Sequence, residues 1–313
     1  MREKFQEIAF KADTLKLIAQ ADTIITEYQR RGFMLTVRQL YYQFVSRDII
    51  PNSMKEYKRL ASILNDARIA GLLDWAAIED RTRNVRRTTT WSSPRSILNA
   101  VAYQYKEDPW EKQPYAPEVW IEKDALVGVI ESVCTEFRIP YFACRGYASQ
   151  SELYDAGKRF AAARRMGKVP VILHLGDHDP SGLDMTRDIG ARLDMFARGE
   201  IEVRRLALNM DQVDQYNPPP NPAKTTDARF ANYEAEFGES SWELDALDPD
   251  TIQELIRTEV DGLIVGSIWW TSMRNEELRK AQLRKVASNW EDIVLNLETE
   301  GDDDEEDDDL GEE

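Results

Sequence analysis

Three carboxylates follow two apolar segments of the kind that form buried strands. Glu122 comes directly after the run 117–121, and Asp177 and Asp179 come directly after the run 169–175. In an open parallel sheet, ligands bind at the carboxyl ends of the strands, so these acids are expected at one edge. Mg²⁺ is typically held by one or two carboxylates, several waters and substrate phosphates. The pattern predicts a Mg²⁺ site, whereas any one of these acids taken alone indicates only a helix cap or a solvated turn.

Other metal chemistry is disfavoured by composition. The chain has two cysteines and two histidines, which are too few for a disulfide framework or a His/Cys zinc site. His178 lies between the two aspartates, and the alternation of side chains along an extended segment predicts that it points away from the metal. We therefore expect His178 to be structural.

A second set of residues suits nucleophilic chemistry on a phosphate. Arg38 and Tyr42 are four positions apart and share one face of a predicted helix. A tyrosine with a pKa near 10 is a poor nucleophile at neutral pH. A neighbouring guanidinium favours the phenolate and stabilises charge on a phosphate under attack. The alternative is that Tyr41 and Tyr42 are core aromatics of the same helix.

The elements around Tyr42 predict a small helical domain. Segment 1–30 is amphipathic, a second helix begins at Thr36 with the capping-box pattern Thr36…Gln39, and a third spans 54–70. The segment 72–80 then resembles a strand or wing. Three short helices and a strand followed by arginines predict a winged helix-turn-helix, and a generic helical bundle is the alternative.

From residue 117 the pattern changes to alternating strands and helices. Strands are expected over 117–122, 139–146, 169–177 and 201–208, with helices over 124–137, 151–166 and 182–198. This alternation predicts an α/β domain with a parallel sheet and right-handed crossovers. The proline-rich connector 217–222 breaks the pattern, and a helix-rich remainder ends in a long helix over 272–297.

Charge is distributed very unevenly along the chain. The formal net charge is −17, but residues 298–313 hold twelve acids and no base, and this tail is expected to be disordered by self-repulsion. Residues 81–106 hold basic residues and no acid. We expect the arginines that follow the predicted wing to contact DNA phosphates, namely Arg81, Arg83, Arg86 and Arg87. A sequence pI near 4.7 is therefore a poor guide to partners.

Length and hydrophobicity indicate an ordinary globular protein. The chain has 313 residues, of which 42% are hydrophobic, enough for two domains. The apolar run 262–270 is too short to span a bilayer, and the first ten residues lack the apolar core of a signal peptide. These features predict a cytoplasmic protein without a membrane partner.

The motifs together resemble a known family. WIEKDA and, farther along, LGDHDPSG resemble the Toprim domain of topoisomerases and primases, and Glu122, Asp177 and Asp179 match its metal-binding acids. The lysine after the Glu, the Pro-x-Gly after the Asp-x-Asp and the earlier sequence RQLYY resemble the A subunit of topoisomerase VI and its meiotic double-strand-break relatives. The resemblance implies that Tyr42 attacks DNA and forms a 5′-phosphotyrosyl link, with Arg38 and Glu122 as further catalytic residues and Lys123 on the DNA.

The resemblance also implies an organisation. Residues 1–95 would be a winged-helix tyrosine domain, 96–215 a Toprim domain, 216–297 a helix-rich extension and 298–313 the acidic tail. The protein would be a homodimer on double-stranded DNA at the nucleoid, in which the tyrosine of one protomer works with the metal of the other. Strand passage would need an ATPase partner of the B-subunit kind, because this chain has no such region.

Three functions remain open from the sequence. The first is Mg²⁺-dependent DNA cleavage by tyrosine transesterification, similar to a type IIB topoisomerase. The second is a Toprim metallonuclease that hydrolyses DNA with its carboxylates and Mg²⁺ alone. The third is a non-catalytic winged-helix regulator that binds DNA without cutting it.

Overall fold

The computed structural model describes residues 2–78 and 88–303, the last six by their backbone alone. The chain forms two compact units. The first comprises Met1–Asn84 and Pro114–Ile264, and the second comprises Val85–Gln113 and Val265–Glu313. The second unit is therefore built from two segments that are far apart in the sequence.

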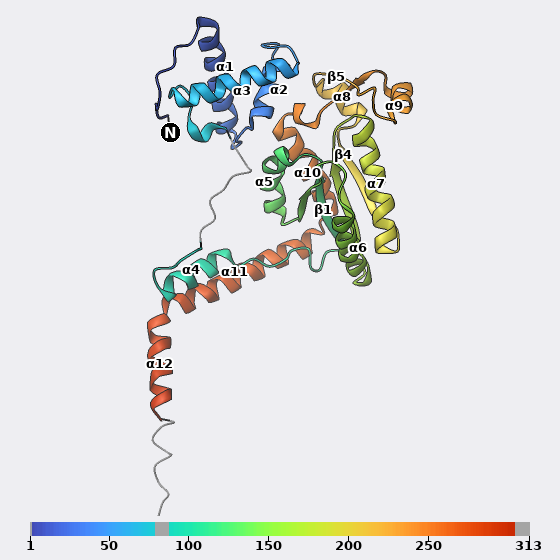
Figure 1. The fold of residues 1–313 in the computed structure, drawn as a ribbon. Helices are drawn as coiled ribbons and strands as arrows, with labels where there is room; N and C mark the ends of the chain where they lie inside the picture. The colour runs from blue at the N-terminus through green and yellow to red at the C-terminus, as the bar shows by residue number, and fades with distance from the viewer. Residues whose placement is uncertain (1, 79–87, 304–313) are drawn as a thin grey trace, which may run out of the picture. The chain divides into compact units, whose positions relative to one another are not determined.

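A four-stranded sheet lies at the centre of the first unit (Figure 1). Its order is β2-β1-β3-β4, and all neighbouring strands are parallel. The predicted α/β fold with a parallel sheet is thus confirmed. The strands are β1 (Tyr115–Ile121), β2 (Tyr141–Ala143), β3 (Val169–Leu175) and β4 (Glu202–Ala207).

Helices cover both faces of this sheet (Figure 1). On one face lie α5 (Val127–Phe137) and α10 (Pro249–Leu263), and on the other lie α6 (Gln150–Arg165) and α7 (Pro180–Ala197). Strands buried on both faces read as near-continuous apolar runs, which explains the sequences of β1 and β3. One hydrophobic core joins the sheet to α6 and α7 through Trp120, Leu153, Phe160, Ile172, Ile189 and Leu193.

Three helices precede the sheet in the same unit: α1 (Ala12–Arg30), α2 (Val37–Ser46) and α3 (Met54–Ile69). The predicted capping box is present at the start of α2. The Thr36 hydroxyl accepts a hydrogen bond from the Gln39 amide at 3.2 Å, and the Gln39 side chain accepts one from the Thr36 amide at 2.8 Å. The sequence therefore fixes the start of the tyrosine helix locally.

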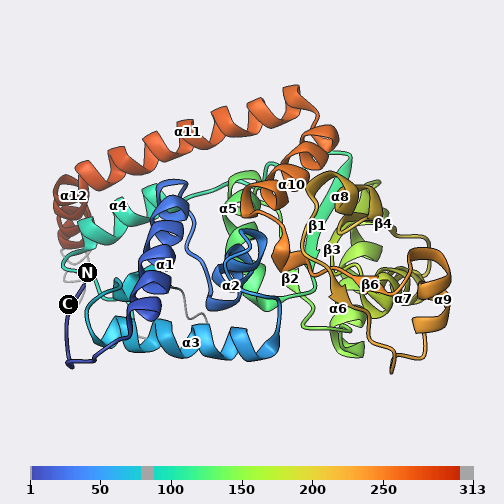
Figure 2. The same ribbon diagram turned by 90° about the horizontal axis from the view of Figure 1, so that it is seen from above.

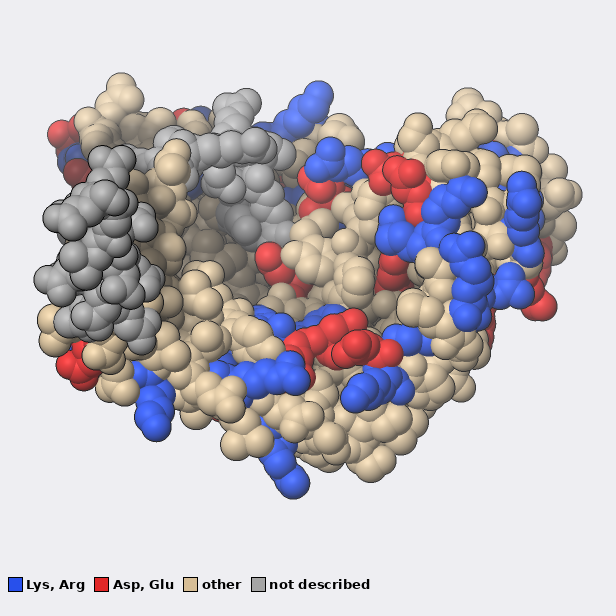
Figure 3. Space-filling model, turned by 90° about the horizontal axis from the view of Figure 1, so that it is seen from below, with Lys and Arg blue, Asp and Glu red and all other residues tan. Residues whose placement is uncertain are grey.

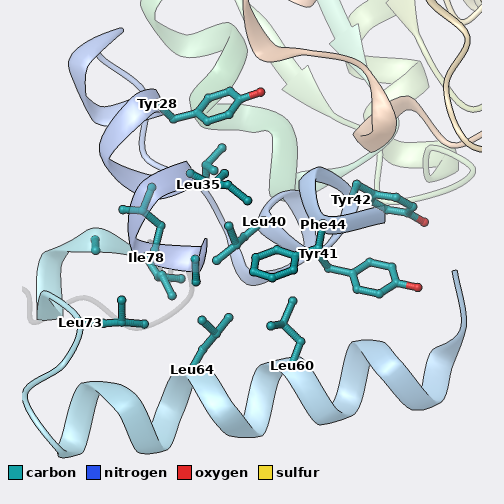
Figure 4. Close-up of a cluster of buried hydrophobic side chains, with 14 of the residues drawn as sticks. Tyr28, Leu35, Leu40, Tyr41, Tyr42, Phe44, Leu60, Leu64, Leu73 and Ile78 are labelled. Atoms are coloured by element: carbon teal, nitrogen blue, oxygen red, sulfur yellow. The ribbon is translucent and has the colours of Figure 1, made fainter. Parts of the chain in front are cut away.

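The core of these helices orients the two tyrosines (Figure 4). Leu40 and Phe44 are fully buried against α3, where they meet Leu60 and Leu64. The rings of Tyr41 and Tyr42 lie at the edge of this cluster, with their hydroxyls pointing away from it. Packing of α2 thus presents both hydroxyls on a different side from its core face.

The segment 72–80, predicted to be a strand or wing, is not a strand in its described part, which ends at Ile78. Trp75–Ala77 forms a 3-10 turn, η1, and only Ile78 makes a bridge, with Leu35. The turn forms because the Asp74 carboxylate accepts a hydrogen bond from the Ala76 amide at 2.8 Å, which caps a helical rather than an extended conformation. The predicted DNA-contacting arginines 81, 83, 86 and 87 lie outside the described residues.

Short elements follow the sheet beyond its β4 edge (Figure 2). Helix α8 (Met210–Tyr216) ends before the proline-rich connector, as expected from the lack of an amide donor in proline. The segment then continues through β5 (Asn221–Pro222), α9 (Phe230–Phe237), β6 (Ser240–Ser241) and the 3-10 turn η3 (Leu244–Ala246). Strands β5 and β6 pair antiparallel, which brings the end of this segment back toward the connector.

The second unit is built on a pair of helices. Helix α4 (Pro94–Gln104) packs along α11 (Gly266–Ser288), and Trp110 meets Trp269 edge to face at 5.8 Å. The long helix predicted over 272–297 is divided, because α11 ends at Ser288 and α12 spans Trp290–Asp303. In the part of the chain that the structure describes, we find no helix with the length and apolar character needed to cross a membrane.

The burial of Leu40 gives a test of this core. Leu40→Ala should lower the free energy of unfolding by about 2–5 kcal/mol, because a cavity remains between α2 and α3. The same substitution at Leu15 of α1, which is 45% exposed, should cost less than about 1 kcal/mol. Urea denaturation measures both, and equal losses would contradict this packing of α2.

A candidate active site at the carboxyl edge of the sheet

The three predicted carboxylates come together where β1 and β3 end. Glu122 directly follows β1, and one of its carboxylate oxygens accepts a hydrogen bond from the Asp177 amide at 2.9 Å. Asp179 is the N-cap of α7 and accepts from the Gly182 amide at 2.6 Å. The expectation that strand ends bring these acids to one edge therefore agrees with their positions, while their role in metal binding stays a prediction.

A partly buried arginine holds the loop that carries the two aspartates. The Arg205 guanidinium, from β4, donates to the carbonyl oxygens of Gly176 at 3.1 Å, Asp177 at 2.6 Å and Gly182 at 3.0 Å. A Cβ atom on Gly182 would lie 2.2 Å from the Asp177 carbonyl oxygen, so only glycine permits this close approach. The loop geometry therefore depends on one cation and one glycine.

A segment 67 residues farther along the chain completes the site. His178 and Trp242 exchange backbone hydrogen bonds of 2.8 and 3.0 Å, which fixes the backbone just before η3. The Leu244 amide then donates to the Asp177 carboxylate at 2.8 Å. Glu243 and Asp245 are thereby placed beside Asp177.

The side chain of His178 belongs to an aromatic cluster and not to the carboxylates. Its Nδ1 atom lies 2.9 Å from the Tyr233 hydroxyl, and its ring packs edge to face on Phe237 at 4.7 Å. Burial and the charge of Arg205 lower the pKa of His178 to about 4, so it is neutral at physiological pH. This arrangement agrees with the structural role that the sequence indicated.

Lys123 lies inside the acidic cluster. Its ammonium is 2.7 Å from an Asp177 oxygen and 3.1 Å from an Asp245 oxygen, and it also contacts Glu243. Burial alone would lower the pKa of Lys123, but these carboxylates outweigh it and raise the pKa above its ordinary value. The predicted DNA contact of Lys123 would require its ammonium to leave these partners.

Burial disfavours the charged forms of two of the predicted metal ligands. Burial raises the pKa of Asp177 well above its ordinary value, with Lys123 opposing the shift and Glu122 adding to it. Burial also raises the pKa of Glu122, and the Asp177 amide and Lys123 oppose that shift while Asp179 adds to it. A cation bound at this edge would favour the charged forms of both carboxyl groups.

The fit to a divalent metal is incomplete as the side chains stand. Among the described residues, no group of three His, Cys, Asp or Glu side chains is arranged to hold a metal ion. Asp177 is held by Lys123 and the Leu244 amide, whereas Asp179 has Lys224 at 3.7 Å. Since Mg²⁺ needs only one or two protein carboxylates, Glu122 and Asp179 fit it best.

The tyrosine helix contacts this cluster through Arg38. Its guanidinium lies 2.6 Å from a Glu243 oxygen and 2.8 Å from an Asp245 oxygen. The centroid of the Tyr42 ring is 6.0 Å from the Arg38 guanidinium carbon. Arg38 and Tyr42, the pair predicted to act on phosphate, are thus joined to the carboxylate edge through Glu243 and Asp245.

Tyr42 lines a cavity of about 330 Å³ together with Arg38, Tyr57, Asn221 and Glu243. It is only 5% exposed. Burial raises the pKa of Tyr42 above its ordinary value and Glu243 adds to this, while Arg38 opposes it. The hydroxyl is therefore protonated at neutral pH.

Tyr41 lines the same cavity, but its hydroxyl is engaged by the chain. Its hydroxyl donates to Asn52 at 2.9 Å and accepts from the Ser53 amide at 2.7 Å, which holds the turn before α3. Its side chain is therefore engaged in structure.

Sequence reasoning missed Arg205, Glu243 and Asp245. A usable signal was the sequence WELDAL, in which two acids flank a leucine in a polar segment. Its spatial proximity to Glu122 could not be read from spacing, because a backbone pairing between His178 and Trp242 creates it.

On the face drawn in Figure 3, Lys and Arg side chains gather toward the right of the view, and elsewhere they lie beside Asp and Glu. The predicted phosphate contacts of Arg81, Arg83, Arg86 and Arg87 lie outside the described residues.

Comparison of the chain with protein-family models, with curated proteins and with solved structures gives no match. Function is therefore inferred from the geometry of this edge and from the sequence motifs.

The close approach of Gly182 to the aspartate loop is testable within one helix. Gly182→Ala should lower the free energy of unfolding by about 1–3 kcal/mol, because the new Cβ must displace the Asp177 carbonyl. Gly190→Ala, also in α7, meets its nearest atom at 3.8 Å and should raise stability by about 0.5–1 kcal/mol. Urea denaturation of both variants checks this, and a neutral Gly182→Ala would refute the loop geometry.

Proposed function

We propose that this protein is a Mg²⁺-dependent DNA-cleaving enzyme that resembles the topoisomerase VI A subunit. Tyr42 is the nucleophile, Arg38 assists it, and Glu122, Asp177 and Asp179 form the acidic edge. The observation that carries the proposal is the continuous set of ion pairs from Arg38 through Glu243 and Lys123 to Asp177. A tyrosine helix that served only as core would not need this connection.

Arg38 supplies the electrostatic part of the chemistry. Its guanidinium is on the same helical face as Tyr42 and is 42% exposed, so a phosphate entering the cavity can contact it. A cation placed there stabilises charge that develops on the phosphate oxygens. Because Tyr42 lines the same cavity, a DNA phosphate bound there would also lie near the Tyr42 hydroxyl.

The reaction is a transesterification without net hydrolysis. A bond forms between the Tyr42 hydroxyl oxygen and phosphorus, and the bond from phosphorus to the 3′ oxygen breaks. The phenol loses its proton during the attack, and the leaving 3′ oxygen gains one. The products are a 5′-phosphotyrosyl link and a free 3′-hydroxyl, so the reverse step can reseal the strand.

Mg²⁺, when bound, would offset negative charge on the scissile phosphate. Glu122 and Asp179 would hold it, and Asp177 would be the third carboxylate of the set. Lys123 supplies positive charge to the same edge and keeps Asp177 and Glu243 close together.

The wider organisation follows the resemblance. Helices α1–α3 would form the helix-turn-helix of a winged-helix domain, and the parallel sheet with its helices would form a Toprim domain. The enzyme would act on double-stranded DNA as a homodimer at the nucleoid, with one strand cut by each protomer. Strand passage would require an ATPase partner of the B-subunit kind.

A hydrolytic metallonuclease is the second candidate. The low exposure of Tyr42 favours it, because a nuclease that activates water has no need of an accessible tyrosine. Hydrolysis would leave no protein on the DNA, so a covalent adduct separates the two mechanisms. A non-catalytic DNA-binding regulator would give neither adducts nor cleavage.

Tyr42→Phe should abolish covalent protein–DNA adducts while preserving DNA binding, since only the hydroxyl is lost. Tyr41→Phe is the matched control and should retain adducts, because the Tyr41 hydroxyl is bound to Asn52 and Ser53 and is not the proposed nucleophile. Supercoiled plasmid is incubated with protein and Mg²⁺, denatured, and assayed for protein attached to 5′ ends. Cleavage by Tyr42→Phe at the wild-type rate would leave the metallonuclease as the better account.

Asp179→Asn should reduce Mg²⁺-dependent cleavage at least about 100-fold. Loss of a group that only orients a metal ligand lowers activity by up to about 100-fold, and loss of the ligand itself should lower it at least as much. The fold should survive, since asparagine also caps a helix N-terminus well. Asp155→Asn, exposed on α6, is the control and should cleave normally. Plasmid cleavage across a Mg²⁺ titration, with thermal unfolding of each variant, measures both effects. Unchanged cleavage by Asp179→Asn would exclude Asp179 as a ligand.

A further inference from the structure

The proline-rich connector places one amide side chain in the tyrosine cavity. Asn221 lies between two prolines, Pro220 and Pro222, whose rings restrict the backbone. It also pairs with Ser241 across the antiparallel β5 and β6. Its side chain lines the cavity of about 330 Å³ that Tyr42 lines. The connector thus holds an amide beside the tyrosine, and the proposed function gives this amide no role.

A backbone carbonyl fixes the direction in which the Asn221 amide faces. The Asn52 Nδ2 atom donates to the Pro220 carbonyl oxygen at 3.3 Å and to Asn221 Oδ1 at 2.5 Å. A carbonyl oxygen only accepts hydrogen bonds, so the part of Asn52 beside Pro220 must be its NH₂ group. The atom of Asn221 that faces this NH₂ group must then be its oxygen. The NH₂ group of Asn221 therefore lies on the other side of its planar amide.

The Asn221 NH₂ group interacts with the Tyr42 hydroxyl. Burial raises the pKa of Tyr42, and a hydrogen bond with the Asn221 side chain opposes this shift. A hydrogen bond lowers the pKa of a phenol when it is donated to the phenol oxygen, because it then favours the charged form. This direction agrees with the orientation that the Pro220 carbonyl imposes on the two amides.

We propose that Asn221 is a catalytic residue, whose amide donates a hydrogen bond to the Tyr42 oxygen and stabilises the negative charge that develops there as Tyr42 attacks DNA. The inference rests on the proposed function, and it holds whichever protomer supplies the metal. In the transesterification, the phenol still loses its proton, while Asn221 neither gains nor loses one. Asn52 is a positioning residue, because it acts through Asn221.

The rate of adduct formation tests the Asn221 donor. Asn221→Ala should slow adduct formation about 10- to 100-fold, the size expected for loss of one hydrogen bond to a charged group. Asn221→Asp should be at least as slow, because a carboxylate places negative charge beside the phenolate. Asn217→Asp adds the same charge at an exposed position of the connector and should react normally. Wild-type rates in both Asn221 variants would overturn the proposal.

The pKa of residue 42 is measurable without DNA or metal. A fluorotyrosine incorporated at Tyr42 ionises at lower pH than tyrosine, and ¹⁹F NMR of the folded chain follows its ionisation. Asn221→Ala and Asn221→Asp should both raise this pKa, whereas Asn217→Asp should leave it unchanged. All these variants retain the charged groups that act on Tyr42, namely Glu243, Arg38 and Lys123. An unchanged pKa in both Asn221 variants would contradict the hydrogen bond.

The positioning role of Asn52 is tested by the same NMR measurement. Asn52→Leu removes the donor to the Asn221 oxygen without adding charge, so it should raise the pKa of residue 42. In an Asn221→Ala background it should have no further effect, because Asn52 acts only through Asn221. Additive shifts would refute this role.

The adduct assay and the NMR titration separate the two levels of the account. A wild-type protein that forms no adduct would refute the proposed function, and a catalytic role of Asn221 with it. The ¹⁹F titration would still decide whether Asn221 donates to Tyr42, since it requires no cleavage.

Discussion

The pairing of buried charges governs this site. Asp177, Glu243 and Asp245 all contact the Lys123 ammonium. Asp177 and Asp245 are buried, where unpaired charges are costly. Among the described residues, Lys123 and Arg38 form the ion pairs with these acids. Lys123 follows β1 and Arg38 lies in the first turn of α2. The negative charge of the acids therefore constrains where these two elements can lie. The tyrosine helix is positioned by electrostatics as well as by its hydrophobic core.

The parallel sheet makes this concentration of charge attainable. Carboxyl ends of β1 and β3 place Glu122 and Asp177 at one edge, and Arg205 on β4 binds the carbonyl groups of the intervening loop. The pairing of His178 with Trp242 then adds acids from a distant segment. In the proposed function, a divalent ion would offset the charge of these acids, and Arg38, which contacts Glu243 and Asp245, would receive the phosphate.

Local signals in the sequence predicted the elements that carry the site. The capping box at Thr36, the apolar runs of β1 and β3 and the acids that end them depend on neighbouring residues alone, and the structure has them where expected. Contacts between distant segments were not predictable in this way. Glu243 joins the site because Trp242, the residue before it, pairs with the backbone of His178. Helix α4 packs on α11 although all the strands of the sheet lie between these two helices in the sequence. In the described part of the segment expected to form the wing, Trp75–Ala77 is a 3-10 turn, because the Asp74 side chain caps it.

The identity of the bond between protein and DNA tests the central claim most directly. Plasmid cut by the wild-type protein in Mg²⁺ is digested to short nucleotides, the protein is cleaved to peptides, and the peptides are analysed by mass spectrometry. The account predicts a nucleotide phosphate attached to the peptide that contains Tyr42. DNA ends that carry free 5′-phosphates, with no nucleotide on any peptide, would contradict it.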